Sequence, residues 1–439
     1  MRISDLLTDL VAERTGKEMY RAVADLYPLC RSITGEGLRR TLRYVGDHVP
    51  LEIHEVPSGT EVLDWTVPKE WNVRDAYIAN AQGERVVDFR RSNLHLLNYS
   101  VPVKAQMSLG ELRPHLHTLP DTPDWVPYRT SYYRETWGFC LSHRQLLELP
   151  EGQYDVHIDS SLEPGHLSYG ESYLPGSTTD EVLISCHSCH PSLANDNLSG
   201  IVVAMSLAQL LSRCSRRYSY RFLFIPGTIG SITWLARNES GVGRIKHGLV
   251  LACLGDRGGF TYKRSRRGDS EIDRAVAHVL RERAAGHRIE AFSPYGYDER
   301  QFCSPGFNLP VGCFMRTPHG RFPEYHTSAD DLQLVSADAL AESLETCLAI
   351  LEFVEDNERY VSQNQKGEPQ LGKRGLYRSL GGPTHEGVTE MSLLWVLNLS
   401  DGHHSLLDIA ERSGRPFRSL KAAATLLVAH DLLKEAIHE

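Results

Sequence analysis

The sequence predicts an α/β fold with a mainly parallel sheet, a small inserted β domain and a C-terminal winged helix-turn-helix. From Val182 to Val354, apolar runs of strand length alternate with segments of helical periodicity, as in a parallel sheet with helical crossovers. Residues 51–159 follow a period of two, and three short amphipathic helices end the chain. Because 439 residues exceed one hydrophobic core, we expect an α/β domain in residues 1–50 and 160–358, an inserted β-rich domain in 51–159 and a winged-helix domain in 359–439.

The composition is that of an ordinary globular protein, with 41% apolar and 23% charged residues. A net charge of -9 argues against a general nucleic-acid binder, and the basic clusters at 213–217 and 263–267 are short. The nine scattered cysteines suggest no disulfide framework and favour a reducing compartment. The chain begins with an amphipathic pattern that contains acids, and it has no apolar run of membrane-spanning length. We therefore expect a cytoplasmic protein without a membrane partner.

The first half of the chain divides into a helical part and a β part. Residues 4–49 have helical spacing, broken by a loop at Arg31-Ser-Ile-Thr-Gly-Glu-Gly37. Residues 51–158 contain short period-two runs between Pro and Gly turns, which predicts an all-β insertion. Its aromatic residues either form the core of that module, the favoured interpretation, or belong to a loop that covers the edge of the main sheet. They are Trp65, Trp71, Trp125, Tyr132, Tyr133, Trp137 and Phe139.

Alternating strands and helices predict the main sheet. The expected strands are Val182–Ile184, Tyr220–Ile225, Gly248–Leu254 and Leu309–Met315. The expected helices are Leu198–Leu211, Ile229–Ala236, Ile272–Arg283 and Ala337–Val354. Polar turns follow the first three strands, and the carboxyl ends of parallel strands meet at one edge. The pattern therefore predicts a ligand site at that edge.

His187, His190 and Asp196 follow the first of these strands. Two neutral imidazoles and a carboxylate are ligands suited to zinc. A single histidine at a strand end is more often only a hydrogen-bonded loop residue, and Cys186 and Cys189 can equally be small core hydrophobes. A metal site is favoured because further candidate ligands follow later in the chain.

Those further ligands are Asp256, in a Gly-rich turn after the third strand, and His326. An aspartate in such a turn is commonly only a turn former. Asp330 or Asp331 can cap the helix that follows. Two histidines and two aspartates from separate loop ends make a tetrahedral nitrogen and oxygen set, which predicts a zinc site.

The segment Tyr295–Pro310 places acids beside Arg300. It can be a surface loop held by a salt bridge. In the functional interpretation, Arg300 binds a substrate carboxylate, and Asp298 or Glu299 either transfers a proton or binds the substrate amine. Glu324 lies close to His326 in the sequence and is another candidate acid.

Three segments near the C-terminus have the order and length of a winged helix-turn-helix: Glu390–Leu399, Ser405–Ala410 and Phe417–Leu433. Such motifs often read DNA, but the expected second helix of the motif is only weakly basic at residues 418–424. A packing or dimerisation module is favoured over DNA binding, and dimerisation through it would give a homo-oligomer.

The chain resembles a bacterial family of zinc-aminopeptidase-like proteins within the co-catalytic zinc exopeptidases. The resemblance covers nearly the whole chain and rests on eight runs. They are Gly59-Thr-Glu-Val-Leu-Asp-Trp-Thr-Val-Pro-Lys-Glu-Trp71, Ser131-Tyr-Tyr with Trp137-Gly-Phe-Cys140, Cys189-His-Pro-Ser-Leu-Ala-Asn-Asp-Asn-Leu-Ser-Gly200, Thr228-Ile-Gly-Ser-Ile232, Ser265-Arg-Arg-Gly268, Asp298-Glu-Arg-Gln-Phe-Cys-Ser-Pro-Gly306 and Glu324-Tyr-His-Thr-Ser-Ala-Asp330. It implies a three-layer α/β/α catalytic domain with an N-terminal β insertion and a C-terminal winged helix.

The resemblance also implies roles for individual residues. Asp196 corresponds to a carboxylate that bridges two zinc ions, and His190, with His187 as its rival, Asp256 and His326 correspond to other ligands. The glutamates that serve such enzymes as general base and second-zinc ligand are replaced by Gly227 and Thr228. Thr228 is typical of the bacterial family but Gly227 is not, and Tyr297 stands where the family tends to have serine.

We therefore expect a zinc-dependent aminopeptidase-like hydrolase, with one zinc ion or two, that acts on an amide bond of a small peptide or aminoacyl conjugate in a biosynthetic pathway. Loss of the base glutamate leaves three explanations: another acid replaces it, the chemistry has drifted, or the site only binds. Glu324 is the first substitute, before Asp298 and Glu299, and Arg300 and Tyr325 are expected to contact substrate. The alternative is a catalytically silent scaffold whose winged helix engages a partner or DNA.

Overall fold

The computed structural model describes residues 2–283, 285–376 and 389–436. The chain forms two compact units, Met1–Ile350 and Leu351–Glu439, and each is described by itself. Within the described ranges, no helix has the length and apolarity needed to cross a membrane.

An eight-stranded sheet is the centre of the first unit. Its order is β1 (Glu52–Pro57), β10 (His166–Leu174), β12 (Ser219–Ile225), β11 (Glu181–His187), β13 (Ile245–Leu251), β16 (Val311–Met315), β14 (Thr261–Lys263) and β15 (Arg288–Glu290). The central strands β12, β11, β13 and β16 are parallel, which confirms the predicted mainly parallel sheet. All seven residues of β11 are buried, as expected for a strand covered on both faces.

The sheet edges contain strands that the sequence pattern did not separate. β1 pairs with β10 and therefore lies in the main sheet, although its period-two pattern resembles that of the insertion. The three-residue strands β14 and β15 were not predicted, because such short runs carry little periodic signal. Antiparallel pairing of β1 with β10, of β10 with β12 and of β14 with β16 closes both sides of the parallel core.

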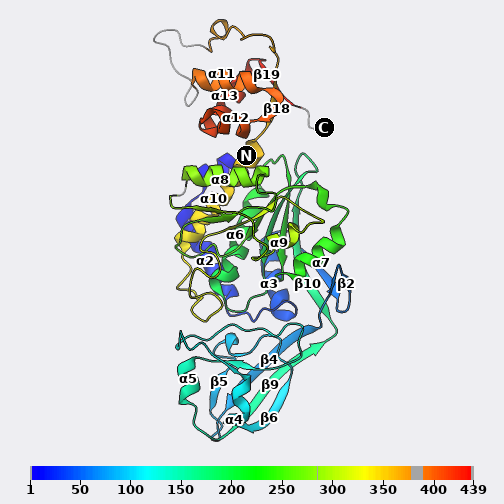
Figure 1. The fold of residues 1–439 in the computed structure, drawn as a ribbon, viewed down its shortest axis with the longest axis vertical. Helices are drawn as coiled ribbons and strands as arrows, with labels where there is room; N and C mark the ends of the chain where they lie inside the picture. Colours follow the sequence, from blue (N-terminus) through cyan, green and yellow to red (C-terminus); the bar gives the residue numbers. More distant parts are fainter. Residues whose placement is uncertain (1, 284, 377–388, 437–439) are drawn as a thin grey trace. The chain divides into compact units, whose positions relative to one another are not determined.

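Helices cover both faces of this sheet (Figure 1). The chain moves from β11 to β12 through α6 (Gly200–Leu211) and returns across β11 to β13 through α7 (Ile229–Asn238). Because parallel crossovers are right-handed, these opposite directions place α6 and α7 on opposite faces. The remaining main helices of the unit are α2 (Ala12–Leu26), α3 (Glu36–Gly46), α8 (Glu271–Arg283) and the part of α10 (Ala337–Asp356) up to Ile350. Sheet and helices together form the predicted layered α/β architecture.

The inserted β module has its own antiparallel sheet in the order β5 (Arg85–Asp88), β4 (Glu70–Ala79), β9 (Gln153–Glu163) and β6 (Val103–Ser108). Figure 1 shows the long strands β4 and β9 side by side, consistent with their pairing. Buried and exposed positions alternate along β9, and Trp71 and Phe139 are buried in the hydrophobic core. The aromatic residues therefore contribute to a core, while Trp65 and Tyr133 remain exposed.

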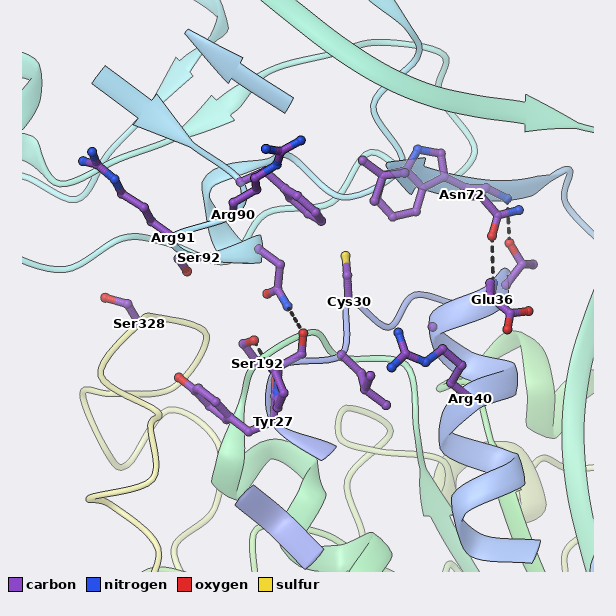
Figure 2. A pocket seen from close by; sticks show the side chains of 18 of the residues that line it. Tyr27, Cys30, Glu36, Arg40, Asn72, Arg90, Arg91, Ser92, Ser192 and Ser328 are labelled. Carbon is purple, nitrogen blue, oxygen red and sulfur yellow. Dashed lines mark hydrogen bonds between the residues drawn. The ribbon is translucent and has the colours of Figure 1, made fainter. Parts of the chain in front are cut away.

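A cavity of about 610 Å³ lies where the module meets the turn between α2 and α3 (Figure 2). Its walls come from residues 27–37 of the helical layer, from residues 71–73 and 89–93 of the module, and from Ser192, Ser328 and Asp331.

The second unit has the expected winged-helix elements. Helices α11 (Glu390–Leu399), α12 (Leu406–Ser413) and α13 (Phe417–Ala429) pack with a three-stranded sheet of β18 (Asp401–Ser405), β17 (Arg359–Ser362) and β19 (Leu433–Glu435). The last helix is shorter than predicted, because the chain turns at Asp431, which has a φ of 56°, and then forms β19. Residues 377–388 and 437–439 of the predicted winged-helix domain lie outside the described residues.

Candidate metal centre

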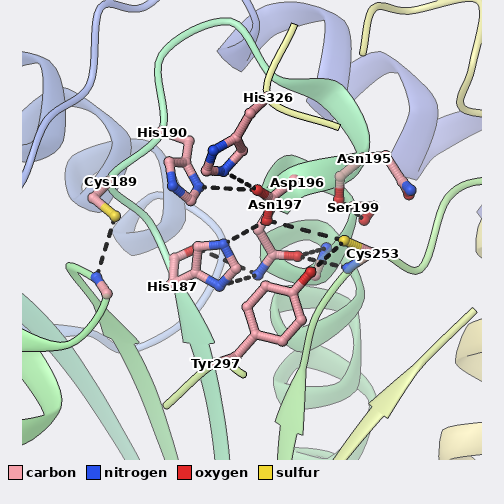
Figure 3. Close-up of polar contacts among 12 residues, drawn as sticks. His187, Cys189, His190, Asn195, Asp196, Asn197, Ser199, Cys253, Tyr297 and His326 are labelled. Atoms are coloured by element: carbon pink, nitrogen blue, oxygen red, sulfur yellow. Dashed lines mark hydrogen bonds and ion pairs between the residues drawn. The ribbon is translucent and has the colours of Figure 1, made fainter. Parts of the chain in front are cut away.

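The candidate metal centre lies at the carboxyl end of the central strands, where the sequence predicts it. His187 is the last residue of β11, Asp196 lies in the turn before α6, and His326 lies in the loop before α10. The ligand atoms of His187, His190 and Asp196 all lie within 4.8 Å of one another. Figure 3 shows His326 on the opposite side of the Asp196 carboxylate from His187.

The carboxylate of Asp196 is the centre of this group and is fully buried. Its Oδ1 lies 2.8 Å from Nε2 of His187, while its Oδ2 lies 3.0 Å from Nε2 of His326 and 3.5 Å from Nδ1 of His190. Burial by itself raises the pKa of Asp196, but the histidines around it outweigh burial and hold that pKa well below its usual range. The aspartate is therefore ionised, as a metal ligand must be.

His190 has the protonation state of a metal ligand. Burial lowers its pKa to about 3, so its imidazole is neutral at pH 7. Its buried Nδ1 takes part in no hydrogen bond with the described residues. Nε of the buried Arg31 donates to the carbonyl oxygen of His190 at 2.8 Å and so fixes this loop. A neutral imidazole with an unused ring nitrogen suits a divalent cation.

Backbone and side-chain hydrogen bonds hold Asp196 in place. Asp330 accepts the backbone N–H groups of Asn195 at 2.6 Å and of Asp196 at 3.0 Å. Burial raises the pKa of Asp330 to about 8. The side chain of Asn197 donates to the carbonyl oxygen of Leu251 at 2.9 Å. These contacts tie the turn before α6 to β13 and to the His326 loop.

The prediction that Asp330 or Asp331 caps the next helix is wrong. Asp330 binds the 195–196 turn, and Asp331 accepts the N–H of Gln333 at 2.7 Å. Ser336 instead makes this contact at the start of α10, where its Oγ accepts the N–H of Ala339. The carboxylates face loop backbone because the helix begins several residues later than the loop pattern suggests.

The structure does not bring Asp256 into the group around Asp196. Its carboxylate accepts the hydroxyl of Thr317 at 2.7 Å, the N–H of Gly258 at 2.6 Å and the side-chain amide of Asn195 at 3.1 Å. Asp256 therefore stabilises the turn in which it lies, the plainer of the two sequence interpretations.

Cys253 lies beside Asp196, where Asp256 was expected from the sequence. Its buried Sγ lies 4.0 Å from Oδ1 of Asp196 and 3.1 Å from the hydroxyl of Tyr297. Donor atoms around a four-coordinate zinc ion lie about 3–4 Å apart, given its bond lengths. Sequence reasoning missed this cysteine because it lies inside the predicted strand Gly248–Leu254, whereas β13 already ends at Leu251.

The three acids of the substrate hypothesis differ in their surroundings. Oδ1 of Asp298 accepts the N–H of Thr228 at 2.8 Å and the hydroxyl of Ser231 at 3.0 Å, and burial raises its pKa. Glu299 is buried in an ion pair with Lys263. Half-buried Glu324 precedes Tyr325, and among the described residues its carboxylate has neither a hydrogen bond nor an ion pair.

Arg300 and Tyr325 also lie near the group. Nη2 of Arg300 donates to Oγ1 of Thr228 at 3.3 Å, and its buried Nε has no hydrogen-bond partner among the described residues. The ring of Tyr325 stacks on His326 with centroids 4.0 Å apart. Both side chains are therefore placed beside residues that border the candidate centre.

Aromatic rings enclose the histidines. Tyr297 stacks on His187 with ring centroids 5.2 Å apart. Tyr128 makes edge-to-face contacts with His190 and His326, with ring centroids 5.2 and 5.0 Å apart. Tyr128 belongs to the β insertion, and its N–H donates to the carbonyl oxygen of His326 at 2.8 Å. A loop of the insertion therefore covers the edge of the main sheet, the second of the two sequence interpretations.

The backbone around the centre is unusual at several positions. Thr228, Cys253 and His326 are non-glycine residues with φ values of 65°, 49° and 56°. Such conformations are unfavourable and concentrate at functional sites. At Gly227, by contrast, an added Cβ would lie 3.4 Å from Sγ of Cys189 and 3.5 Å from Cβ of His187. The backbone at Gly227 thus leaves room for a side chain next to His187.

A family model described as "Domain of unknown function (DUF4910)" matches residues 20–357, and a model described as a winged helix-turn-helix matches residues 358–435. The chain belongs to the DUF4910 family. The second match confirms the winged helix predicted at the C-terminus.

Relatives support the aminopeptidase-like character of this DUF4910 chain. A Clostridium acetobutylicum protein, provisionally named a polysaccharide biosynthesis protein with an aminopeptidase-like domain, is 52% identical over 423 residues and is covered to 97%, with 96% of this chain covered. The crystal structure of a provisionally assigned peptidase from the same organism has a TM-score of 0.93 and 50% identity, with 99% of each chain covered.

A more distant neighbour shares the fold. The zinc aminopeptidase of Bacillus subtilis has a TM-score of 0.55 at 11% identity, with 76% of this chain and 94% of that chain covered. The DUF4910 chain therefore has an aminopeptidase-like fold, which confirms the resemblance stated from the sequence motifs.

Proposed function

We propose that this protein is a zinc-dependent hydrolase that cleaves an amide bond in a small peptide or aminoacyl conjugate. The observation that carries the proposal is the buried, ionised Asp196 with three histidines around its two oxygens. The fold shared with a zinc aminopeptidase supports the choice of metal and of reaction class.

The residues present fit a zinc ion. His187, His190 and His326 would supply imidazole nitrogens and Asp196 carboxylate oxygens, and Nδ1 of half-buried His190 makes no hydrogen bond with the described residues. His187 and Cys253 lie on the Oδ1 side of Asp196, and His190 and His326 lie on its Oδ2 side. These residues would hold one zinc ion or two, and they would supply the nitrogen, oxygen and sulfur atoms that zinc prefers.

A bound zinc ion supplies Lewis acidity, which polarises a carbonyl oxygen and acidifies water. The chain's own residues must then move the proton and hold the substrate. Tyr128, Tyr297 and Tyr325 flank the histidines and limit access of bulk water. Arg300 has an unpaired Nε and is proposed to bind a substrate carboxylate.

Glu324 is proposed as the general base that takes a proton from the attacking water and delivers it to the departing amine. Its carboxylate is uncommitted among the described residues, and it stands two positions before His326. Asp298 and Glu299 are weaker candidates, because one binds the start of α7 and the other is paired with Lys263. Exchange of Glu324 for Gln should lower kcat about 10²- to 10⁴-fold without loss of metal.

The test combines metal analysis of the purified protein with hydrolysis of aminoacyl amides. Wild-type protein should retain zinc through dialysis and should release amine, and both properties should be lost in Asp196→Ala and reduced in His190→Ala. The exposed His166 of β10 provides a matched control, since His166→Ala should change neither. Zinc-free wild-type protein that gains no activity on zinc addition contradicts the proposal.

A second candidate, a metal-site scaffold without catalysis, is favoured by one observation. Gly227 replaces the glutamate expected after β12, so the usual base is missing. In that case the wild-type protein would bind zinc, but Glu324→Gln would leave an already negligible turnover unchanged.

A further inference from the structure

The cavity between the β module and the helical layer is separate from the histidine group and has a different chemistry. Its volume of about 610 Å³ is in the range of small-molecule sites. Three arginines line it, Arg40, Arg90 and Arg91, together with two acids, Glu36 and Asp331. Glu36 is paired with Arg43, and Arg90 is paired with Asp75 at 2.9 Å.

Arg40 and Arg91 are the cations of the cavity wall that have no acidic partner among the described residues. Of these two arginines, Arg40 is the one whose guanidinium group Figure 2 shows directed toward Cys30. Arg91 lies on the other side of the same view. An uncommitted guanidinium group on a cavity wall is suited to a carboxylate or phosphate, which it binds with two parallel hydrogen bonds.

Asn93 provides the second observation. It is only 8% exposed and lines the cavity, and its Nδ2 donates to the carbonyl oxygen of Pro28 at 3.4 Å. Its Oδ1 is buried and accepts no hydrogen bond from the described residues. A buried acceptor without a donor is unfavourable by itself, so a ligand hydroxyl at this position would be stabilised.

Serine hydroxyls complete the polar wall. Oγ of Ser192 donates to the carbonyl oxygen of Tyr27 at 2.8 Å and so keeps its lone pairs for a ligand. Oγ of Ser328 accepts the N–H of Val126 at 3.0 Å, and Oγ of Ser92 accepts the N–H of Leu94 at 3.3 Å, so both keep a hydrogen to donate. The wall therefore combines two arginines that have no ion pair among the described residues, Arg40 and Arg91, with hydrogen-bond acceptors and donors for several hydroxyl groups.

We propose that this cavity binds a hydroxylated ligand that carries an anionic group, such as a sugar phosphate or a sugar acid, with the anion at Arg40 and a hydroxyl at Asn93. The site goes beyond the hydrolase proposal, because no candidate metal ligand lines it. The phosphate and the carboxylate share the chemistry that Arg40 recognises, and the experiment separates them.

The test is calorimetric titration of the full chain with glucose 1-phosphate, glucuronate, glucose and inorganic phosphate. At least one of the two anionic sugars should bind at millimolar or lower concentration, and more tightly than glucose or phosphate alone. Arg40→Ala should weaken that binding by about tenfold or more, since it removes a charge-assisted contact. The exposed Arg21 of α2 lies outside the cavity, so Arg21→Ala is the matched control and should bind as wild type.

Asn93→Leu tests the hydroxyl contact. It should weaken binding of the anionic sugar but leave binding of inorganic phosphate unchanged, because only the sugar reaches Oδ1. The affinities should also be the same after metal removal. The proposed ligand binding in the cavity can therefore be confirmed or contradicted independently of the hydrolase proposal. Absence of binding by both anionic sugars, or equal binding by Arg40→Ala and wild type, overturns the inference.

Discussion

The two carboxylate oxygens of Asp196 face different histidines, with Oδ1 2.8 Å from Nε2 of His187 and Oδ2 3.0 Å from Nε2 of His326. This division connects the end of β11 with the loop before α10 through a single side chain. Because the turn that carries Asp196 is fixed by Asp330, the position of the carboxylate depends on residues that touch no metal ligand atom.

Asp330→Asn should therefore weaken metal binding without removing a ligand. A carboxamide can accept only one of the two N–H groups that Asp330 now accepts, so the 195–196 turn should loosen. Loss of such outer contacts typically lowers metal affinity about 10- to 100-fold. Competition with a zinc chelator measures the change. An affinity equal to that of wild type would show that the turn is held in other ways.

Cys253→Ser should report whether the cysteine is a ligand. In the cobalt-substituted protein, a coordinated thiolate gives an intense near-ultraviolet charge-transfer band, which serine cannot give. We expect this band in wild type and its loss in Cys253→Ser, because Sγ lies 4.0 Å from Oδ1 of Asp196. Cys347→Ser is the matched control, since that buried cysteine lies on α10 and outside the group. A wild-type spectrum without the band removes Cys253 from the ligand set.

Gly227→Glu should raise amide hydrolysis by about 10²- to 10⁴-fold if the missing carboxylate is what limits the reaction. The substitution should be tolerated, because an added Cβ meets only Cys189 and His187 at van der Waals distance. Gly227→Gln has nearly the same size and no charge, so it should give no gain. Equal rates for the Glu and Gln variants would mean that another group already serves as base.

His247 should make folding stability depend on pH. Burial lowers its pKa to about 4, below the value of about 6.5 in an unfolded chain. The unfolded state therefore binds more protons than the folded state between pH 6.5 and 4. The contribution of His247 to the free energy of unfolding is present above pH 6.5 and is lost as the pH falls. Between pH 7 and 5 this loss is about 2 kcal/mol. Urea unfolding should show that the free energy of unfolding depends less on pH in His247→Leu than in wild type. Identical dependence on pH in the two proteins would contradict this prediction.

The winged helix should not bind DNA strongly. On α13, Arg418 lies 3.5 Å and Lys421 3.2 Å from carboxylates of Glu352 and Asp356. These two cations are thus partly neutralised within the same unit, whereas phosphate binding needs free positive charge. Titration of random duplex DNA at low salt should give no mobility shift. A shift that weakens steeply with salt would instead indicate a nucleic-acid surface.

The sequence by itself determined the parallel sheet, the β insertion and the winged helix, because each depends on a local period of apolar residues that burial then requires. It also determined that His187, His190 and Asp196 lie together, since they follow one strand within ten residues. Tertiary structure alone decided which later residues join them. Asp256 and Cys253 are three positions apart, yet the backbone turn at Cys253 directs one toward Thr317 and the other toward Asp196. Long-range packing sets such directions, and no local pattern encodes them.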